Sequence, residues 1–503
     1  MTGNSTPDVL ICGAGAAGLT LAIELARRGL SFRVIDKARS PFVGSRGKGI
    51  QPRTQEIFED LGILDKVVAA GGPYPPQRQY RDDGSYVDSS LTGPVQVTAA
   101  EPYHLPLMVP QFLTERILRE RLSESGRWVE FGHELIDFTH APEGVTARVR
   151  GPQGEEVVSC RYLVGADGGR SLVRKQLGVA FPGATLGVRA LVADVAMSGL
   201  DRDAWHQFNG GDMARMVAIC PLAGTALFQI QAPLPLGEQA DLSAAGLTAL
   251  VADRTRRDDI IVHSVTWASD YQMNARLAEQ YRVGRVLLVG DAAHVHPPTG
   301  GQGLNTSVQD AYNLGWKIAA ALQAHQQGPL DSYEGERRPV AEAVLGLATR
   351  LLDAQKQGAM RRGREVHQLD LGYPGSPLSQ ALGDPPRGVK PGDRAPDAPV
   401  RGAAGQPTRL FHLFHGVQWT LLLSDAGIEA PRPRPGLNIH RIGPKGDIHD
   451  AWGHLRQAYG FEPGHAVLVR PDGYVGATFG ANQNQAAAFD RYWERVGLPP
   501  FEA

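Results

Sequence analysis

A glycine-rich segment near the amino terminus has the spacing of a phosphate-binding turn. Gly13, Gly15 and Gly18 follow a short apolar run and precede a stretch with helical periodicity. Gly13 permits a sharp turn, Gly15 lets a pyrophosphate approach the backbone, and Gly18 allows close packing of helix on strand, while the start of the helix presents free N–H groups. Asp36 ends the next apolar strand, where a carboxylate can accept hydrogen bonds from a ribose. The order of strand, turn, helix, strand and acid predicts dinucleotide binding.

Two later segments each join a buried strand to an acidic, glycine-rich turn. Residues 162–171 read Tyr-Leu-Val-Gly-Ala-Asp-Gly-Gly-Arg-Ser, with Asp167 at the end of the strand. Residues 285–294 read Arg-Val-Leu-Leu-Val-Gly-Asp-Ala-Ala-His, with Asp291 in the equivalent place, and a turn rich in proline and glycine follows. Glycines in that turn would let the backbone contact a flat ring, which side chains would block. A helix that starts near Leu304 would direct the positive end of its dipole at such a ring.

Together with the first turn, these segments resemble the flavin-dependent aromatic hydroxylases, a family that includes phenol, hydroxyphenylpropionate and polyketide hydroxylases and the rifampicin monooxygenases. The resemblance spans residues 8–350. It implies an FAD-dependent monooxygenase that takes electrons from NADPH or NADH as a transient reductant and reacts with O2. A flavin C4a-hydroperoxide would then hydroxylate an aromatic or polyketide-like small molecule. No second Gly-x-Gly-x-x-Gly unit of this kind is found, so the nicotinamide cofactor is not expected to have a domain of its own.

The resemblance also assigns FAD contacts along the chain. At the adenine end, the implied residues are Gly13, Gly15, Ala17 and Gly18 at the pyrophosphate, Asp36 and Lys37 at the adenosine ribose, and Leu135 at the adenine. At the flavin end, they are Arg46, Gln111, Asp167, Asp291, Pro298, Gly300, Gly301, Gly303, Leu304 and Asn305. Within this set, Gln111 and Asp291 are expected at the ribitol, and Asp167 is expected to serve both FAD and the nicotinamide cofactor. Leu304 and Asn305 are expected to offer backbone N–H groups to the isoalloxazine.

The segment at 181–275 is expected to form the wall of the substrate pocket. The principal candidates for substrate contacts are Arg215, Met216, Phe228, Gln229 and Trp267, and the wider set adds His206, Met213, Gln231 and Tyr271. Because successive residues of a strand face opposite sides, about half of these must point away from the pocket. No catalytic base is identified. His294 and His296 form an H-x-H pair without further ligands, so no metal site is predicted.

The order of apolar segments predicts an α/β protein with four parts. These are a discontinuous Rossmann-like FAD-binding domain (1–180 and 276–370), an inserted and mostly antiparallel β-sheet substrate domain (181–275), a proline-rich linker (371–390) and a C-terminal domain (391–503). Helices are predicted at 105–125, 304–322 and 450–459. Strands of the later parts are predicted at 190–195, 216–220, 226–231, 260–267, 408–414, 420–423, 439–442 and 466–469.

The C-terminal domain resembles the thioredoxin-like extension of phenol-hydroxylase-type family members. The likeness is carried by Pro-Gly-Asp-Arg-Ala-Pro-Asp at 391–397 and by Val-Leu-Val-Arg-Pro-Asp-Gly-Tyr-Val at 467–475. The last cysteine of the chain is Cys220, so thiol–disulfide chemistry is excluded from this domain. A structural or dimer-contact role is expected instead, and a homodimer stays open.

Composition narrows the class of protein further. The formal net charge of −2 predicts neither nucleic acid nor an anionic membrane as a partner. The polar first residues, the lack of a long apolar run and three widely spaced cysteines predict a cytoplasmic protein with free thiols.

Other outcomes of the same flavin chemistry are epoxidation and Baeyer–Villiger-type ring oxidation, and a non-catalytic flavin-binding protein is the alternative from another class. No two tryptophans are two residues apart, which argues against a flavin-dependent halogenase.

Overall fold

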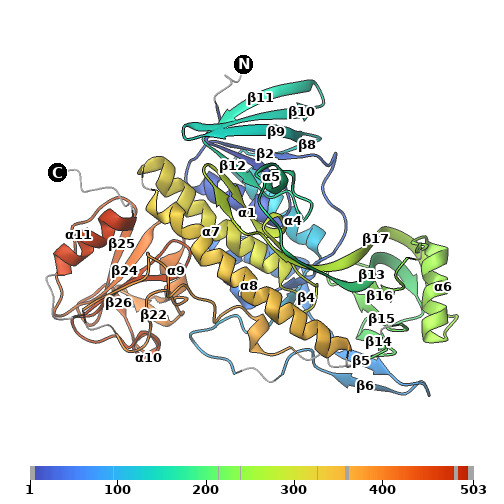
Figure 1. Ribbon diagram of the computed structural model, residues 1–503. Helices are drawn as coiled ribbons and strands as arrows, with labels where there is room; N and C mark the ends of the chain where they lie inside the picture. Colours follow the sequence, from blue (N-terminus) through green and yellow to red (C-terminus); the bar gives the residue numbers. More distant parts are fainter. Residues whose placement is uncertain are drawn as a thin grey trace.

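Short apolar runs form a six-stranded sheet at the centre of the molecule (Figure 1). The structure, a computed structural model, describes residues 6–93, 96–212, 214–237, 239–325, 327–356, 362–383, 386–480 and 485–496. The sheet has the order β18 (Arg282–Val283), β19 (Val286–Leu288), β12 (Tyr162–Gly165), β1 (Val9–Cys12), β2 (Phe32–Asp36) and β8 (Val129–Phe131). All neighbours are parallel except β18 and β19, because helical crossovers join successive parallel strands. The acidic ends of β2 and β12 therefore lie at the same edge.

Long helices pack beside this sheet and define its core. They are α1 (Ala16–Arg27), α4 (Gln111–Glu124), α7 (Gly303–Gln323) and α8 (Gly328–Lys356), with the shorter α2 (Pro52–Asp60), α3 (Leu64–Ala70) and α5 (Leu172–Gln176) and the 3-10 turns η1 (Gly290–Ala292) and η2 (Arg364–Val366). Helix α7 packs against both α1 and α8. The helix predicted at 105–125 begins only at Gln111, because Pro106 and Pro110 hold the preceding residues in extended backbone.

Mostly antiparallel strands build an eight-stranded sheet on one flank of the central sheet (Figure 1). Its order is β20 (His294–Val295), β17 (Ile261–Leu277), β13 (Gly183–Ser198), β16 (Phe228–Leu234), β15 (Val217–Pro221), β14 (Trp205–Phe208), β5 (Gln77–Tyr80) and β6 (Tyr86–Ser89), in which β14 and β5 form the parallel pair. The strands predicted within 181–275 are found, but β5, β6 and β20 join them from outside that range. Helix α6 (Ala244–Thr255), which was not predicted, starts where the Ser243 hydroxyl accepts the N–H of Gly246 and buries Leu247 and Val251.

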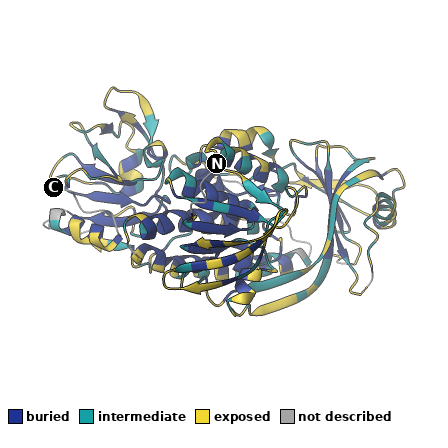
Figure 2. Ribbon diagram, turned by 90° about the horizontal axis from the view of Figure 1, so that it is seen from above, coloured by how far each residue is buried: buried dark blue, intermediate teal, exposed yellow. Residues whose placement is uncertain are grey.

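Two small sheets complete the part of the chain that precedes the C-terminal sheet. One joins β3 (Gly49–Ile50), β7 (Leu107–Met108) and β4 (Gly72–Pro73), and the other joins β11 (Gly154–Cys160), β10 (Gly144–Gly151) and β9 (Glu134–Ala141). Figure 2 shows the buried residues concentrated in the central layers, with exposed residues on the outer strands and helices. Among the described residues, no helix combines the length and apolarity needed to cross a membrane.

The C-terminal residues form a separate eight-stranded sheet on the opposite flank (Figure 1). Its order is β21 (Gln380–Leu382), β28 (Val475–Phe479), β27 (Ala466–Val469), β24 (Trp419–Ser424), β25 (Leu437–Ile442), β26 (Ile448–His449), β22 (Pro399–Gly402) and β23 (Pro407–Arg409), with α9 (Leu410–Phe414), α10 (His454–Tyr459) and α11 (Gln485–Val496). The strand predicted at 408–414 is wrong beyond Arg409. Leu410, Phe411, Leu413 and Phe414 follow helical spacing and form α9. Strand β21 falls in the predicted linker and pairs with β28.

Candidate active site

The amino-terminal ends of α1 and α7 open into one cavity of about 360 Å³. Residues from separate parts of the sequence form its wall, and those predicted to contact FAD are Gly15, Ala17, Arg46, Gln111, Asp291, Pro298, Gly301, Gly303 and Leu304. The first backbone N–H groups of both helices have no partner within their own helix, and both dipoles present their positive end here. The cavity therefore favours negatively charged or hydrogen-bond-accepting groups of a ligand.

The three glycines of the first turn have different structural roles. Gly13 has φ +110°, and a Cβ there would lie 2.1 Å from the carbonyl oxygen of Ala166. A Cβ at Gly18 would lie 1.9 Å from the carbonyl oxygen of Gly13, so both positions accept only glycine. Gly15 has an ordinary φ of −75°, and the nearest atom to a Cβ there is a Glu115 carboxylate oxygen at 3.8 Å. A side chain at Gly15 would thus occupy the cavity without disturbing the turn.

The residues predicted at the adenosine make contacts within the protein. The Asp36 carboxylate accepts the backbone N–H of Ala14 at 2.8 Å and that of Ala38 at 2.8 Å, so it braces the glycine turn. Lys37 is exposed at the end of β2. Leu135 is buried in β9. Their contacts with adenosine stay predictions.

Two polar side chains beside the cavity leave buried atoms unpaired. Asp167 accepts the backbone N–H groups of Leu172 at 2.7 Å and Val173 at 3.1 Å through one oxygen, and its Oδ1 has no partner among the described residues. His296 lines the cavity with its Nδ1 2.9 Å from the carbonyl oxygen of Pro297, and its Nε2 is also unpaired within that set. Burial lowers the pKa of His296, which keeps the ring neutral at physiological pH. Such unpaired buried atoms are typical of a site that receives a polar ligand.

The turn before α7 adopts the backbone that its glycines predicted. Gly300 has φ +81° and Gly301 has φ +64°, both in the left-handed region. The side chain of Asn305 fixes this turn from behind: its amide donates to the carbonyl oxygens of Gly301 and Gly49, each at 2.8 Å. Its Oδ1 accepts the backbone N–H of Gln51 at 2.8 Å. Asn305 therefore connects β3, the turn and the first residues of α7.

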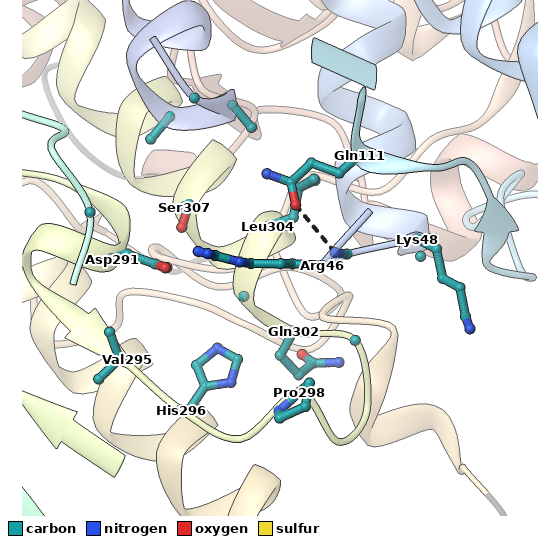
Figure 3. A pocket seen from close by; sticks show the side chains of 18 of the residues that line it. Arg46, Lys48, Gln111, Asp291, Val295, His296, Pro298, Gln302, Leu304 and Ser307 are labelled. Atoms are coloured by element: carbon teal, nitrogen blue, oxygen red, sulfur yellow. Dashed lines mark hydrogen bonds between the residues drawn. The ribbon is translucent and has the colours of Figure 1, made fainter. Parts of the chain in front are cut away.

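Arg46 and Gln111 approach the cavity from the side of α4 (Figure 3). The Gln111 Oε1 accepts the backbone N–H of Gly47 at 3.2 Å, and its amide donates to Glu115 at 2.8 Å. Burial raises the pKa of Glu115, which also lines the cavity. Sequence analysis missed Glu115, although its position four residues after Gln111 on a helix was an available signal.

A second, smaller cavity of about 80 Å³ adjoins the eight-stranded sheet that contains β13 and β17. Tyr271 and Pro298 line both cavities, so the two meet at these residues. Among the substrate candidates, Met216, Gln231 and Tyr271 line the smaller cavity.

Four further substrate candidates line neither cavity. Arg215 donates to the carbonyl oxygen of Asp253, and Phe228 packs in the core of the sheet. Trp267 contacts Phe42 edge to face, and His206 forms a hydrogen bond with Tyr80. Met213 lies outside the described residues.

Gln229 has a supporting position behind the cavity wall. Its Oε1 accepts a hydrogen bond from Lys48 Nζ at 2.7 Å, and its amide donates to the Ser45 hydroxyl at 2.8 Å. Ser45 in turn donates to Asp194 at 2.6 Å. Lys48 is only 8% exposed and lies with its Nζ 4.4 Å from the centre of the Trp205 ring. Lys48 lines the larger cavity and was missed by sequence analysis, because a lone lysine between glycines carries no spacing signal.

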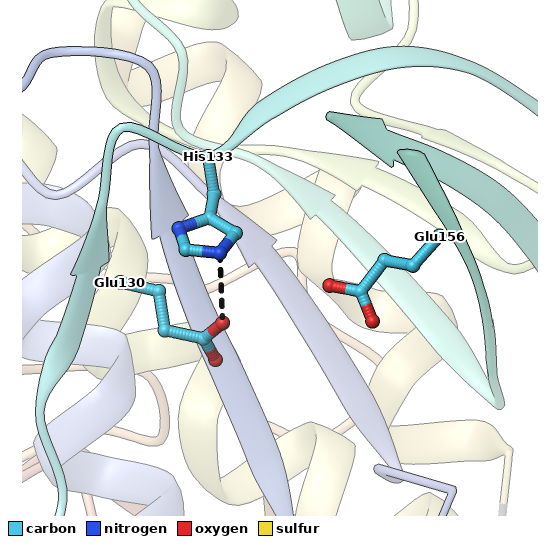
Figure 4. A group of neighbouring side chains, drawn as sticks. All are labelled: Glu130, His133 and Glu156. Carbon is cyan, nitrogen blue, oxygen red and sulfur yellow. Dashed lines mark ion pairs between the residues drawn. The ribbon is translucent and has the colours of Figure 1, made fainter. Parts of the chain in front are cut away.

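One group of side chains away from the cavity has the composition of a metal site. Glu130, His133 and Glu156 lie close together in Figure 4. Arg33 donates to Glu130 at 2.6 Å and to Glu156 at 2.7 Å, so a guanidinium already compensates both carboxylates. The group is an ion-pair network.

These features suit FAD as the ligand of the larger cavity. A glycine turn leaves space for a pyrophosphate, and two helix amino termini face the same volume. The buried and unpaired Asp167 Oδ1 and His296 Nε2 can bond with a polar cofactor.

Comparisons with known proteins agree with this geometry. The sequence model of the FAD binding domain family matches residues 6–348, and that of the family described as aromatic-ring hydroxylase, C-terminal matches residues 389–497. A flavin-dependent monooxygenase of Mycobacteroides abscessus is 41% identical over 93% of this chain and 96% of the relative. A 6-methylpretetramide 4-monooxygenase of Streptomyces rimosus is 35% identical over 94% of this chain and 90% of the relative. The crystal structure of aklavinone-11 hydroxylase with FAD and aklavinone aligns with a TM-score of 0.83 at 28% identity, covering 99% of this chain and 100% of that chain. The chain therefore belongs to the FAD-binding aromatic-ring hydroxylases and is a flavoprotein monooxygenase, as its three glycine-rich segments predicted.

Proposed function

We propose that the protein hydroxylates a planar, electron-rich aromatic compound of polyketide type, with NADPH or NADH as transient reductant and O2 as the oxygen source. The observation that carries this proposal is the junction of the two cavities at Tyr271 and Pro298. A ring held against the eight-stranded sheet would meet the cofactor cavity there. The names of the relatives support the substrate class, since one acts on 6-methylpretetramide and another was solved with aklavinone.

Residues in and beside the larger cavity would hold FAD in the orientation that the family resemblance implies. Gly15 and Ala17 at the start of α1 would receive the pyrophosphate, and Asp36 the adenosine ribose. Asp291 would accept a ribitol hydroxyl. The N–H groups of Leu304 and Asn305 would face the ring, where the dipole of α7 favours negative charge. Bound FAD would supply the redox chemistry, namely hydride acceptance and the activation of dioxygen.

The rest of the chain would exclude water and position the substrate. The eight-stranded sheet to which the proposed substrate domain at 181–275 contributes β13 to β17 would cover the ring that is oxidised. The proposed Rossmann-like domain would comprise 1–180 and 276–370. After the linker at 371–390, we assign the cysteine-free residues 391–503 to a thioredoxin-like domain with a structural role or a homodimer contact.

Anaerobic reduction by NADPH tests the proposed function. The yellow, FAD-loaded protein is mixed with NADPH in the presence and absence of phenols and polycyclic quinones, and the loss of flavin absorbance is timed. We expect the right substrate class to accelerate reduction, and aerobic turnover to add one oxygen atom from labelled O2 to the product. Release of hydrogen peroxide with every aromatic compound left unchanged would exclude hydroxylation of this class.

A further inference from the structure

Each of the two adjoining cavities has a cation in its wall. Lys48 lines the larger cavity and Arg362 lines the smaller one. The Nη1 of Arg362 lies 3.9 Å from the position that a Cβ would take on Gly301, a residue of the larger cavity's wall. The positive charge of Arg362 also lowers the pKa of Lys48, after the larger effect of burial. Both cations are therefore close to the place where a substrate ring would meet the cofactor cavity.

Neither cation has an ion pair within the described parts of the chain. Lys48 donates to Gln229, and the nearby charge of Asp194 raises the pKa of Lys48 without overcoming the opposite effect of burial. Arg362 interacts with the Tyr74 hydroxyl and the Cys220 thiol. Burial raises the pKa of both of these groups, so they stay neutral and leave the guanidinium uncompensated.

Lys48 is buried and Arg362 is half-buried, so an uncompensated charge at either position is costly, and an anionic ligand would remove that cost. Burial lowers the pKa of Arg362 and of Lys48, which shows that the surroundings disfavour their charged forms. A guanidinium matches the two oxygens of a carboxylate with parallel hydrogen bonds. The smaller cavity adds flat and apolar walls from Trp205, Tyr271 and Met273.

We propose that the substrate is an aromatic carboxylic acid, bound with its ionised carboxylate at Arg362 and Lys48 and its ring between the sheet and the cofactor cavity. This inference rests on the proposed function and specifies its substrate. With the acid held at Arg362, the ring carbon to be oxidised lies on the side of Tyr271 and Pro298, where the two cavities meet. The acid therefore fixes which edge of the ring reaches the cofactor.

Matched acids and amides test the charge of the ligand directly. Salicylate with salicylamide, and 3-hydroxy-2-naphthoate with 3-hydroxy-2-naphthamide, differ in charge but barely in size. Each is titrated into the FAD-loaded protein, and the change in flavin absorption gives a Kd. We expect at least one acid to bind about tenfold more tightly than its amide. Arg362→Gln and Lys48→Gln should each reduce this ratio, and Arg362→Lys should keep part of it. Arg257→Gln is the control, because Arg257 pairs with Asp259 outside both cavities and should leave the ratio unchanged.

Several results would overturn the proposal. The first is that acid and amide bind with equal Kd, or do not bind, in both pairs. The second is that Arg362→Gln weakens the binding of acid and amide equally. The third is that the control variant Arg257→Gln lowers the ratio of the two Kd values as much as Arg362→Gln does. If Arg362→Gln loses FAD or folds poorly, the ratios of the wild-type protein and of Lys48→Gln decide. The titration needs neither NADPH nor turnover, so its outcome is separate from success or failure of the hydroxylation assay.

Discussion

Gly15 and Gly18 lie three residues apart, yet the same added methyl group would have different consequences at the two positions. At Gly18 it would collide with the backbone of the turn at 1.9 Å, so the strand and helix would have to separate. At Gly15 it would meet no atom closer than 3.8 Å and would project into the volume that the pyrophosphate requires. One glycine is needed for folding and the other for binding.

Gly15→Ala should therefore separate cofactor affinity from stability. We expect the FAD-free variant to unfold at the wild-type temperature, because the backbone at this position suits any residue. Its affinity for FAD should fall by at least about tenfold, because the backbone can no longer approach the pyrophosphate. Fluorescence titration of the apoprotein with FAD measures the affinity. The control is Gly375→Ala, at an exposed position without a positive φ where no atom lies within 4 Å of the added Cβ, which should leave both stability and FAD affinity unchanged. Wild-type affinity in Gly15→Ala would contradict the assignment.

Among single residues, the sequence predicted the position of those whose type determines the backbone conformation. Gly13, Gly18 and Gly300 could be placed because only glycine fits their conformations or contacts. Lys48 could not be placed, since its position depends on Gln229, which follows it by 181 residues. Spacing along the chain carries no trace of such a contact.

Among the elements, β3 and α7 form the part of the site that depends most on a single side chain. The three hydrogen bonds of Asn305 connect the backbone of Gly49 and Gln51 with that of Gly301. Asn305, Gly49 and Gln51 are buried and Gly301 is half-buried, so the loss of the amide would leave buried backbone groups unpaired. The turn that lines the cofactor cavity would then lose its anchor.

Asn305→Ala should lower the free energy of unfolding by about 2–3 kcal/mol and weaken FAD binding as well. Urea unfolding of the apoprotein measures the first effect and FAD titration the second. Asn274→Ala removes an amide from strand β17, away from both cavities, and should change neither value appreciably. A stable Asn305→Ala protein with wild-type FAD affinity would show that the turn holds its shape without this anchor.

Elements were predictable where the apolar pattern is unambiguous. The buried strands before Gly13 and Asp167 and the long helix after Gly303 lie where their patterns indicated. Residues 408–414 were misassigned because a short apolar run satisfies strand and helix patterns alike, and the turn into α9 is decided by packing. Strands β5 and β6 joined a distant sheet, a pairing that local sequence does not encode.

For the molecule as a whole, buried charges connect the C-terminal sheet to the helices of the catalytic part. Glu336 on α8 accepts hydrogen bonds from Arg470 at 2.8 Å and from Lys317 of α7 at 2.7 Å. Arg470 follows β27 and also pairs with Asp472 at 2.6 Å. All four side chains are almost completely buried. The C-terminal sheet and helices α7 and α8 therefore share one ionic cluster, and removing one partner would leave charges unpaired in the interior.

Glu336→Gln should lower the free energy of unfolding by about 3–5 kcal/mol, because Arg470 and Lys317 would lose their shared counterion. Calorimetry or urea unfolding at neutral pH measures the loss. Glu342→Gln changes an exposed acid on the same helix and should stay within about 0.5 kcal/mol of the wild-type protein. Equal stability of the two variants would mean that the cluster contributes nothing to the packing of the C-terminal sheet on α7 and α8.

The same cluster predicts how stability changes in acid. Burial alone would raise the pKa of Glu336, but Arg470 and Lys317 outweigh it and hold that pKa far below its ordinary value of 4.5. Asp310 behaves likewise, with Arg337 overcoming burial to lower its pKa below 3.8. A carboxyl whose pKa is lower in the folded than in the unfolded state stabilises the protein above its unfolded pKa, and this stabilisation is lost as the pH falls toward the folded pKa.

Stability of the wild-type protein should therefore decline from about pH 5 downward, because the unfolded chain takes up protons before the folded one does. Glu336→Gln has no proton to gain at that position, so its decline should be shallower and its difference from the wild-type protein should shrink in acid. Glu342→Gln should decline as steeply as the wild-type protein. Urea unfolding at a series of pH values from neutral to mildly acidic checks all three. A constant gap between wild-type protein and Glu336→Gln across that series would mean that Glu336 keeps the same pKa in both states, and that its buried cations do not stabilise the carboxylate.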